Sequence, residues 1–333
     1  MATDSALPKL EPDRLILTHL NADTSWLISF PRPPTKDMEH KVNKRSYFHV
    51  IVDPWLDTEY VFFSRWFIAV SHATPSKYKT IEQVQRLILD IECAAENANL
   101  DPEDKGHPDA VFVSHHLGDH CDRATLEQID PLVPFISIAS VVEHVKKWNH
   151  FQMVESMPDL DIDAPQSLWQ TYESAILPDY LRVGRLPDGG PYPELHWATL
   201  LAFSPSQLRS SNAQVETMLY SPHGIHAHRL IDTNWATKYS KPLLLLHGLN
   251  PAWSPQQANL GVDNASKLAT ILKPKYWIPT HDGELKYRGF LSWFQQKTKK
   301  TFADANLDIE DWGEQDVKPI CRELGNGEVF VLA

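Results

Sequence analysis

Short apolar stretches rich in β-branched and aromatic residues alternate along the chain with segments of helical periodicity. Between residues 80 and 97, apolar side chains recur at the spacing of one helix face, and Thr80 is placed to cap that helix. We expect helices at 80–97, 141–148 and 264–272, and strands at 14–19, 25–30, 46–52, 110–114, 134–138, 181–186, 195–203, 215–220, 242–246 and 275–279. One or two more strands are expected within 60–71. Such alternation is typical of an α/β fold.

The most informative stretch is 109–122, where a buried strand runs into a loop rich in histidine. His115, His116, Asp119 and His120 fall within six positions, and Asp122 is placed to cap a following helix. Imidazole and carboxylate are ligands that zinc and iron accept, and a strand end holds them in fixed geometry. The alternative is that these histidines are ordinary core or surface residues.

This stretch resembles the His-x-His-x-Asp-His motif of the metallo-β-lactamase superfamily. His115, Asp119 and His120 match the motif, whereas Leu117 stands at its second histidine. His116 is one position early, and since side chains alternate near a strand end it does not simply substitute. The resemblance implies a four-layer αβ/βα sandwich. Residues 1–13 are typical of a polar, Pro-containing tail, and we expect a single domain at 14–333. Weak periodicity with several Asp and Pro residues indicates an insertion near 150–180 that would cover the site.

Two further segments extend the resemblance. Asp53, in an Asp-Pro-Trp-Leu turn after an early strand, is similar to a residue at the floor of the site in lactonase-like branches, although a simple turn is equally compatible. The strand at 275–279 leads to His281, which resembles the final metal-binding histidine. The resemblance therefore implies a metal site made of His115, Asp119, His120 and His281, with zinc as the metal. The ligands missing from the motif favour one ion over two.

Other strand ends also carry histidine. His223 and His247 follow two of the expected strands, and loops at one edge of a sheet can bring such residues together. The family's bridging Asp is absent near His223, and nothing around His196 supports it as the central histidine. We expect the metal to activate a water as nucleophile. Asp119, His115, His223 and His247 are the candidate catalytic residues, and any of these histidines could protonate a leaving group or stabilise an oxyanion.

The composition of the chain limits the classes of partner that we expect it to bind. The net charge of −12, with 31 Lys and Arg that form no long basic run, argues against nucleic acid. We expect the 11 Trp to belong mainly to a large core, with an aromatic-lined pocket as the alternative. Three Cys argue against a disulfide framework and favour a cytoplasmic protein. No apolar run is long enough to cross a bilayer, so we expect no membrane partner. We expect a small-molecule substrate, since neutral or apolar compounds suit a Trp-rich, acidic chain better than polyanions do.

Three functions compete. The leading hypothesis is a metal-dependent hydrolase of a small lactone, lactam, ester or thioester. The second is a metal-free isomerase, cyclase or lyase on the same fold, which would explain the incomplete motif. The third is a catalytically silent binding protein. A serine hydrolase is disfavoured because no Gly-x-Ser-x-Gly is present. The sequence carries no signal for the oligomeric state.

Overall fold

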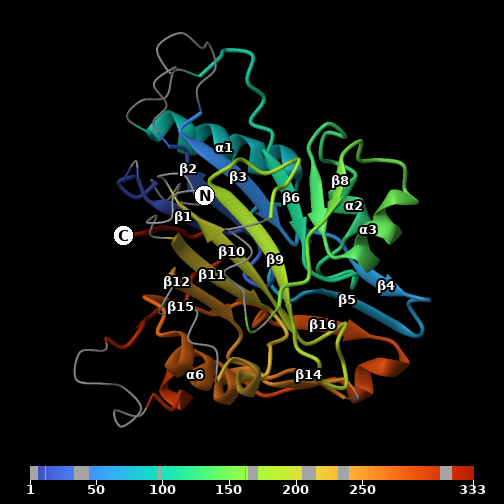
Figure 1. Ribbon diagram of the computed structural model, residues 1–333. Helices are drawn as coiled ribbons and strands as arrows, with labels where there is room; N and C mark the ends of the chain where they lie inside the picture. The colour runs from blue at the N-terminus through green and yellow to red at the C-terminus, as the bar shows by residue number, and fades with distance from the viewer. Residues whose placement is uncertain are drawn as a thin grey trace. The chain divides into compact units, whose positions relative to one another are not determined.

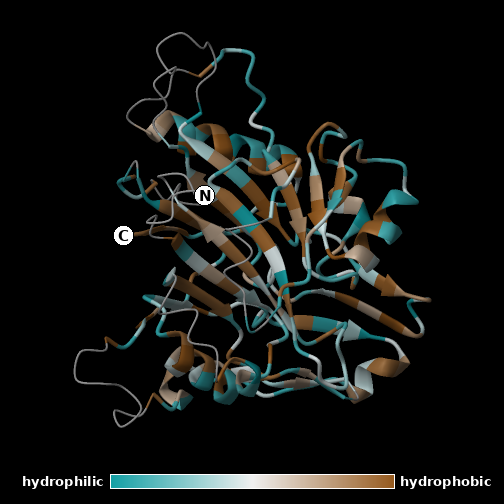
Figure 2. Ribbon diagram, viewed as in Figure 1, coloured by the Kyte–Doolittle hydropathy of each residue, from teal (hydrophilic) through white to brown (hydrophobic). Residues whose placement is uncertain are grey.

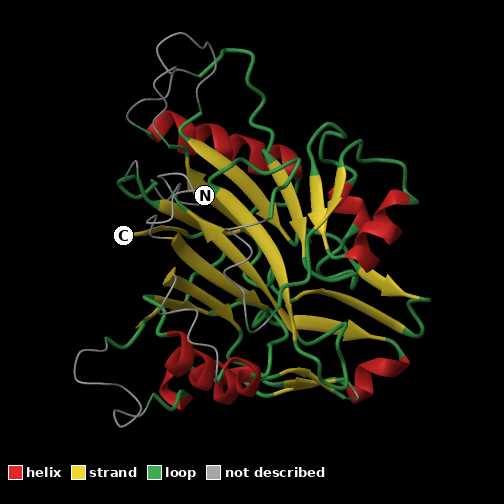
Figure 3. Ribbon diagram, viewed as in Figure 1, coloured by secondary structure: helices red, strands yellow, loops and turns green. Residues whose placement is uncertain are grey.

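The computed structural model describes residues 7–11, 13–33, 45–95, 100–161, 163, 172–204, 215–231, 240–254, 256–307 and 317–333. They form two compact units. Unit 1 comprises 1–58, 74–155 and 324–333, and unit 2 comprises 59–73 and 156–323. Figure 1 labels their helices and strands, and Figure 3 distinguishes helix, strand and loop.

Unit 1 is built on a mixed sheet of seven strands in the order β19-β1-β2-β3-β6-β7-β8. Its strands are β1 (Leu15–His19), β2 (Trp26–Pro31), β3 (Tyr47–Val52), β6 (Ala110–Val113), β7 (Phe135–Ser137), β8 (Val154–Ser156) and β19 (Val329–Leu332). The strands from β19 to β3 pair antiparallel, whereas β3, β6 and β7 pair parallel. Every residue of β1, β2, β3 and β6 is buried, which explains their continuous apolar character.

Three helices belong to unit 1, namely α1 (Ile81–Ala94), α2 (Arg123–Leu126) and α3 (Ala139–Lys146). Thr80 caps α1 as predicted, because its side chain accepts a hydrogen bond from the Gln83 backbone. The apolar face of α1 is buried together with one acid, Glu92. The Glu92 carboxylate accepts the backbone N–H groups of Ser46 and Tyr47, at 2.6 and 2.9 Å, and so anchors α1 to β3.

Unit 2 contains a six-stranded sheet in the order β18-β15-β12-β11-β10-β9. Its strands are β9 (Leu181–Pro187), β10 (Trp197–Phe203), β11 (Val215–Ser221), β12 (Ser240–His247), β15 (Tyr276–Ile278) and β18 (Ile320–Cys321). Strands β9 to β11 pair antiparallel, and β11, β12, β15 and β18 pair parallel. Helix α6 (Gly261–Leu272) lies in the connection between β12 and β15, and its buried face joins the core of this sheet. In Figure 2 brown, the colour of hydrophobic residues, recurs along the strands of both large sheets and alternates in places with white and teal.

Two small sheets complete unit 2. One contains β4 (Tyr60–Phe62), β5 (Ile68–His72) and β16 (Leu285–Arg288), and the other β13 (Ala252–Trp253), β14 (Gln257–Asn259) and β17 (Gln296–Lys297). Three short 3₁₀ helices are η2 (Ala227–Leu230), η3 (Phe290–Phe294) and η4 (Phe302–Asp304).

The predicted strands and helices are confirmed within a few residues at each end, with two instructive differences. Helix α6 begins at Gly261 rather than at 264, since Gly261 adopts a positive φ of 71° and the Val262 N–H bonds the Leu249 carbonyl. Strand β10 begins at Trp197, so His196 precedes it. Most of the expected polar tail and the middle of the expected insertion, 164–171, lie outside the described residues, and a single domain remains a prediction. None of the helices in the described ranges is long and apolar enough to span a membrane.

Candidate metal centre

Asp53 follows β3 in unit 1 and is bound to the histidine-rich loop. Its backbone is left-handed, with φ of 44°, which few residues other than glycine adopt without compensation. The carboxylate is fully buried and accepts hydrogen bonds from the Ser114 N–H at 2.6 Å, the Ser114 hydroxyl at 2.5 Å and His120 Nδ1 at 2.7 Å. The Asp-Pro turn therefore does more than reverse the chain, because the Asp53 carboxylate orients the His120 imidazole.

His120 is the most firmly positioned histidine of unit 1. With Nδ1 donating to Asp53, Nε2 is on the side of Asp119 and lies 3.9 Å from Asp119 Oδ2. Two atoms that ligate one tetrahedral zinc lie about 3.3 Å apart, so a small movement of the Asp119 side chain would suit both to one ion. Burial lowers the pKa of His120, but the carboxylates of Asp119 and Asp53 outweigh it and the pKa is raised.

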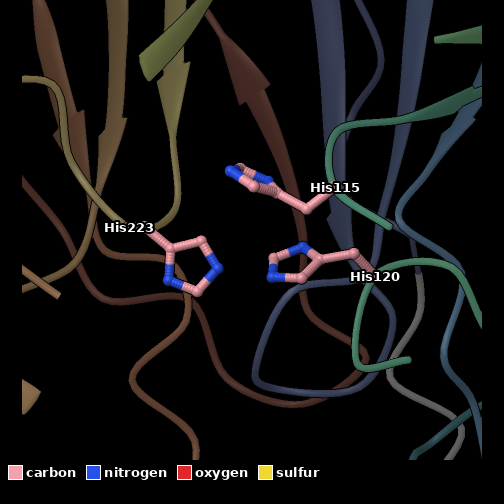
Figure 4. A group of neighbouring side chains, drawn as sticks. All are labelled: His115, His120 and His223. Atoms are coloured by element: carbon pink, nitrogen blue, oxygen red, sulfur yellow. The ribbon is translucent and has the colours of Figure 1, made fainter. Parts of the chain in front are cut away.

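His115 lies beside His120, with ring centroids 5.0 Å apart. Both side chains come from the loop that follows β6 (Figure 4). His115 is 1% exposed and its Nδ1 is bonded to the Ser114 hydroxyl at 2.8 Å. His116 is exposed, whereas His115 is buried, as expected from the alternation of side chains near a strand end. The three motif residues His115, Asp119 and His120 are thus grouped within unit 1.

Unit 2 presents a second pair, His223 and His281, whose rings pack edge to face with centroids 4.8 Å apart. His223 follows β11, and its side chain is drawn in Figure 4. Its Nδ1 donates to the Asn259 side-chain oxygen at 2.8 Å, and its carbonyl accepts the Leu260 N–H at 3.0 Å. His281 is left-handed, with φ of 61°, and its carbonyl accepts a hydrogen bond from the Lys297 ammonium at 3.1 Å.

The loop that carries His281 is fixed by its neighbour Asp282. That carboxylate accepts the backbone N–H groups of Leu249 and Asn250, at 2.6 and 2.8 Å. A Cβ at Gly248 would lie 2.8 Å from the Thr280 carbonyl, so only glycine permits this close approach of the two strand-end loops. Burial raises the pKa of Asp282. Lys297, Asp282 and Gly248 therefore hold the His281 backbone without contributing a ligand.

Two further histidines of unit 2, His247 at the end of β12 and His196 just before β10, have different surroundings. His247 Nδ1 donates to the Gly248 carbonyl at 2.8 Å and its Nε2 accepts from the Asn264 amide at 3.2 Å, a pattern that fits a neutral ring. Burial lowers the pKa of His247 to about 4. His196 bonds the Gln257 carbonyl through Nε2 at 3.1 Å and packs on His226, whose Nδ1 bonds the buried Asp188.

His115, His120 and His223 share one hydrogen-bonding pattern. Each imidazole has its Nδ1 engaged by a polar group of its own unit, which leaves the Nε2 edge as the one suited to a metal. Imidazoles that ligate metals are commonly oriented in this way. Sequence reasoning did not identify Ser114 or Asn259 as their partners. Ser114 could have been noticed because it stands between the strand and the histidine motif. Nothing in the sequence links Asn259 to a histidine 36 positions away.

Comparisons with known proteins bear on the fold. No protein-family model matches the sequence, and no curated protein matches it. Among solved structures, a possible metal-dependent hydrolase from Veillonella parvula is similar at a TM-score of 0.52 and 11% identity, over 95% of this chain and 99% of that one. An isothiocyanate hydrolase from Delia radicum gut bacteria has a TM-score of 0.49 at 12% identity, over 95% and 98% of the chains.

The metallo-β-lactamase fold protein YhfI from Bacillus subtilis has a TM-score of 0.41 at 10% identity, over 96% of this chain and all of its own. At such low identity the likeness concerns the fold alone. The α/β fold that the sequence predicted is confirmed, and the possible metal-dependent hydrolase from Veillonella parvula shares it, whereas the lactonase-like branch remains a prediction.

Proposed function

We propose that this protein is a metal-dependent hydrolase of a small lactone, lactam, ester or thioester. The observation that carries the proposal is the geometry of His120, which bonds Asp53 through Nδ1 and has Nε2 3.9 Å from a carboxylate oxygen of Asp119. An imidazole oriented by one carboxylate and facing another is typical of a metal ligand. The fold shared with the possible metal-dependent hydrolase from Veillonella parvula supports the same reading.

The proposed ligands form two overlapping sets. The first consists of three buried imidazoles, those of His115, His120 and His223, and the second of Asp119, His120 and His281. Both sets contain only nitrogen and oxygen donors, which suit zinc and also iron or manganese. We propose zinc, with one ion bound first. This assignment adds His223 to the predicted ligands His115, Asp119, His120 and His281.

The chain's own residues supply the rest of the chemistry. A bound ion of this kind supplies Lewis acidity toward a carbonyl and toward water. Asp53 holds the His120 ring in one orientation, and Asn259 does the same for His223. Asp119 is partly exposed and within reach of His120 Nε2, so its carboxylate is suited to accept a proton from an attacking water. His247, with its low pKa and two local hydrogen bonds, is poorly suited to donate a proton, and His115 is available for that role only where it does not ligate the metal.

Metal content and turnover test the proposal directly. Protein purified without chelator is analysed by mass spectrometry of the elements, and a panel of lactones, esters and thioesters is assayed before and after treatment with a chelator. We expect bound zinc close to one equivalent, hydrolysis of at least one class, and loss of both on chelation with recovery on adding zinc. A protein that binds no divalent metal would contradict the proposal and favour the metal-free enzyme or the binding protein.

A further inference from the structure

Unit 2 carries an exposed group of large aromatic side chains, which we call the aromatic platform. Its members are Phe62, Phe63, Trp66, Phe290, Trp293 and Phe294. Three of them are almost fully exposed, Phe63 at 85%, Trp66 at 76% and Trp293 at 84%. They come from the β4–β5 hairpin and from η3, which are distant in sequence. Single exposed apolar residues are ordinary, but a contiguous aromatic group marks an interaction surface.

The platform is rigidly built. Strand β5 pairs with both β4 and β16, and the Phe290 N–H bonds the Trp66 carbonyl at 2.8 Å. Gly289 makes this junction possible, because its φ is 94° and a Cβ there would lie 2.7 Å from the Trp66 carbonyl. The rings of Trp66 and Phe290 stack with centroids 6.1 Å apart. The aromatic groups are therefore carried by a paired backbone, which reduces the backbone ordering that binding would require.

The charge around the platform is opposite in sign to that of the whole chain. The segments 59–73 and 284–300 contain six cations, Arg65, Lys286, Arg288, Lys297, Lys299 and Lys300, and two acids, Glu59 and Glu284, which gives +4 in a chain of −12. The Arg65, Arg288 and Lys299 side chains are 79%, 72% and 82% exposed, so their pairs with Glu59 and Glu284 are weak. These six cations, which we call the cationic rim, lie in the same two segments of the chain as the aromatic platform.

We propose that the aromatic platform docks this protein on an anionic membrane surface. Trp and Phe rings favour the boundary between headgroups and acyl chains, and nearby Lys and Arg side chains are attracted to an anionic leaflet. A second copy fits less well, because a twofold contact would place one cationic rim against the other. Binding at a surface needs no spanning helix. The proposal departs from the sequence-based expectation of no membrane partner.

Vesicle binding tests the proposal without reference to metal or turnover. The full chain is sedimented with vesicles of phosphatidylcholine alone and with vesicles that also contain phosphatidylserine, at low and high salt. We expect binding to the anionic vesicles, a decrease as salt rises and a blue shift of Trp emission. The double variant Trp66→Ala/Trp293→Ala should weaken binding about tenfold, which corresponds to about 1.4 kcal/mol. Val317→Ala, at a position 81% exposed and outside the platform, is the matched control.

Two results would overturn the proposal. One is absence of binding to anionic vesicles at low salt. The other is a dimer in the absence of vesicles that dissociates in Trp66→Ala/Trp293→Ala, since the occupant of the platform would then be a second copy. A further variant, Lys286→Glu/Lys299→Glu, separates charge from aromatic insertion and should abolish the preference for anionic vesicles. All these side chains are exposed, so circular dichroism should show each variant folded.

Discussion

Units 1 and 2 are each built on a mixed sheet, but the histidines at their strand ends have different hydrogen-bond partners. In each, antiparallel strands lead into parallel ones, and the strand-end loops carry histidines. In unit 1 the partner of the key imidazole is a buried carboxylate, Asp53, and in unit 2 it is a neutral amide, Asn259. An anionic partner raises the basicity of an imidazole far more than an amide does. The comparison indicates that His120 of unit 1 is held in the more basic form of the two imidazoles.

The largest effect is expected from His120→Ala, which removes the imidazole common to both proposed ligand sets. Loss of an orienting partner costs about 10- to 100-fold in metal affinity or activity, so loss of this ligand should exceed 100-fold. Metal content and hydrolysis are measured together. His116→Ala, at the exposed neighbouring histidine, is the control and should retain both. Equal metal content in the two variants would show that His120 is not a ligand.

Substituting Asp53 and Asn259 in turn tests whether the carboxylate contributes more to metal affinity than the amide does. Asp53→Asn should weaken metal binding by about 10- to 100-fold, because the variant keeps the shape but loses the charge that orients His120. Asn259→Ala should cost about tenfold or less, since only a neutral hydrogen bond to His223 is lost. Competition with a chromogenic chelator gives both affinities. A larger loss for Asn259→Ala would reverse the assigned roles of the two units.

His247 offers a histidine that neither set uses, and its effect should appear in stability. The folded ring stays neutral down to about pH 4, whereas the unfolded ring takes a proton near pH 6.5. The unfolded chain binds more protons in this window, so the folded state loses stability as pH falls, by about 2 kcal/mol between pH 8 and pH 5. In His247→Asn this contribution should vanish. Urea unfolding of both proteins at pH 8 and pH 5 measures it, and parallel losses would contradict the prediction.

The smallest effect concerns helix starts. Thr80 caps α1 of unit 1 through its side chain, whereas α6 of unit 2 begins without a side-chain cap. Thr80→Ala should therefore destabilise the protein by about 1 kcal/mol, because the Gln83 N–H loses its side-chain acceptor. Thr80→Ser, which keeps the hydroxyl, should be close to wild type in thermal unfolding. If the two variants were equally destabilised, loss of the methyl group rather than of the cap would be responsible.

Local sequence patterns alone were sufficient to predict many of the strands, helix caps and motif residues of this protein. The caps at Thr80 and Asp122, the strands with continuous apolar character and the motif around His120 were all readable, because periodicity, capping and strand ends depend on residues close in sequence. Strand β19 was not readable, because its four residues gain meaning only by pairing with β1, more than 300 positions away.

Tertiary structure decided which of the similar strand-end histidines belong together. In the sequence His223, His247 and His281 look alike, since each follows an apolar strand. The fold packs the His223 ring against that of His281 and bonds it to Asn259, whereas it encloses His247 between Gly248 and Asn264. The sequence determined that strands would end in imidazoles. Their partners, and hence their protonation and orientation, depend on burial and on hydrogen bonds between distant segments, which only the folded chain creates.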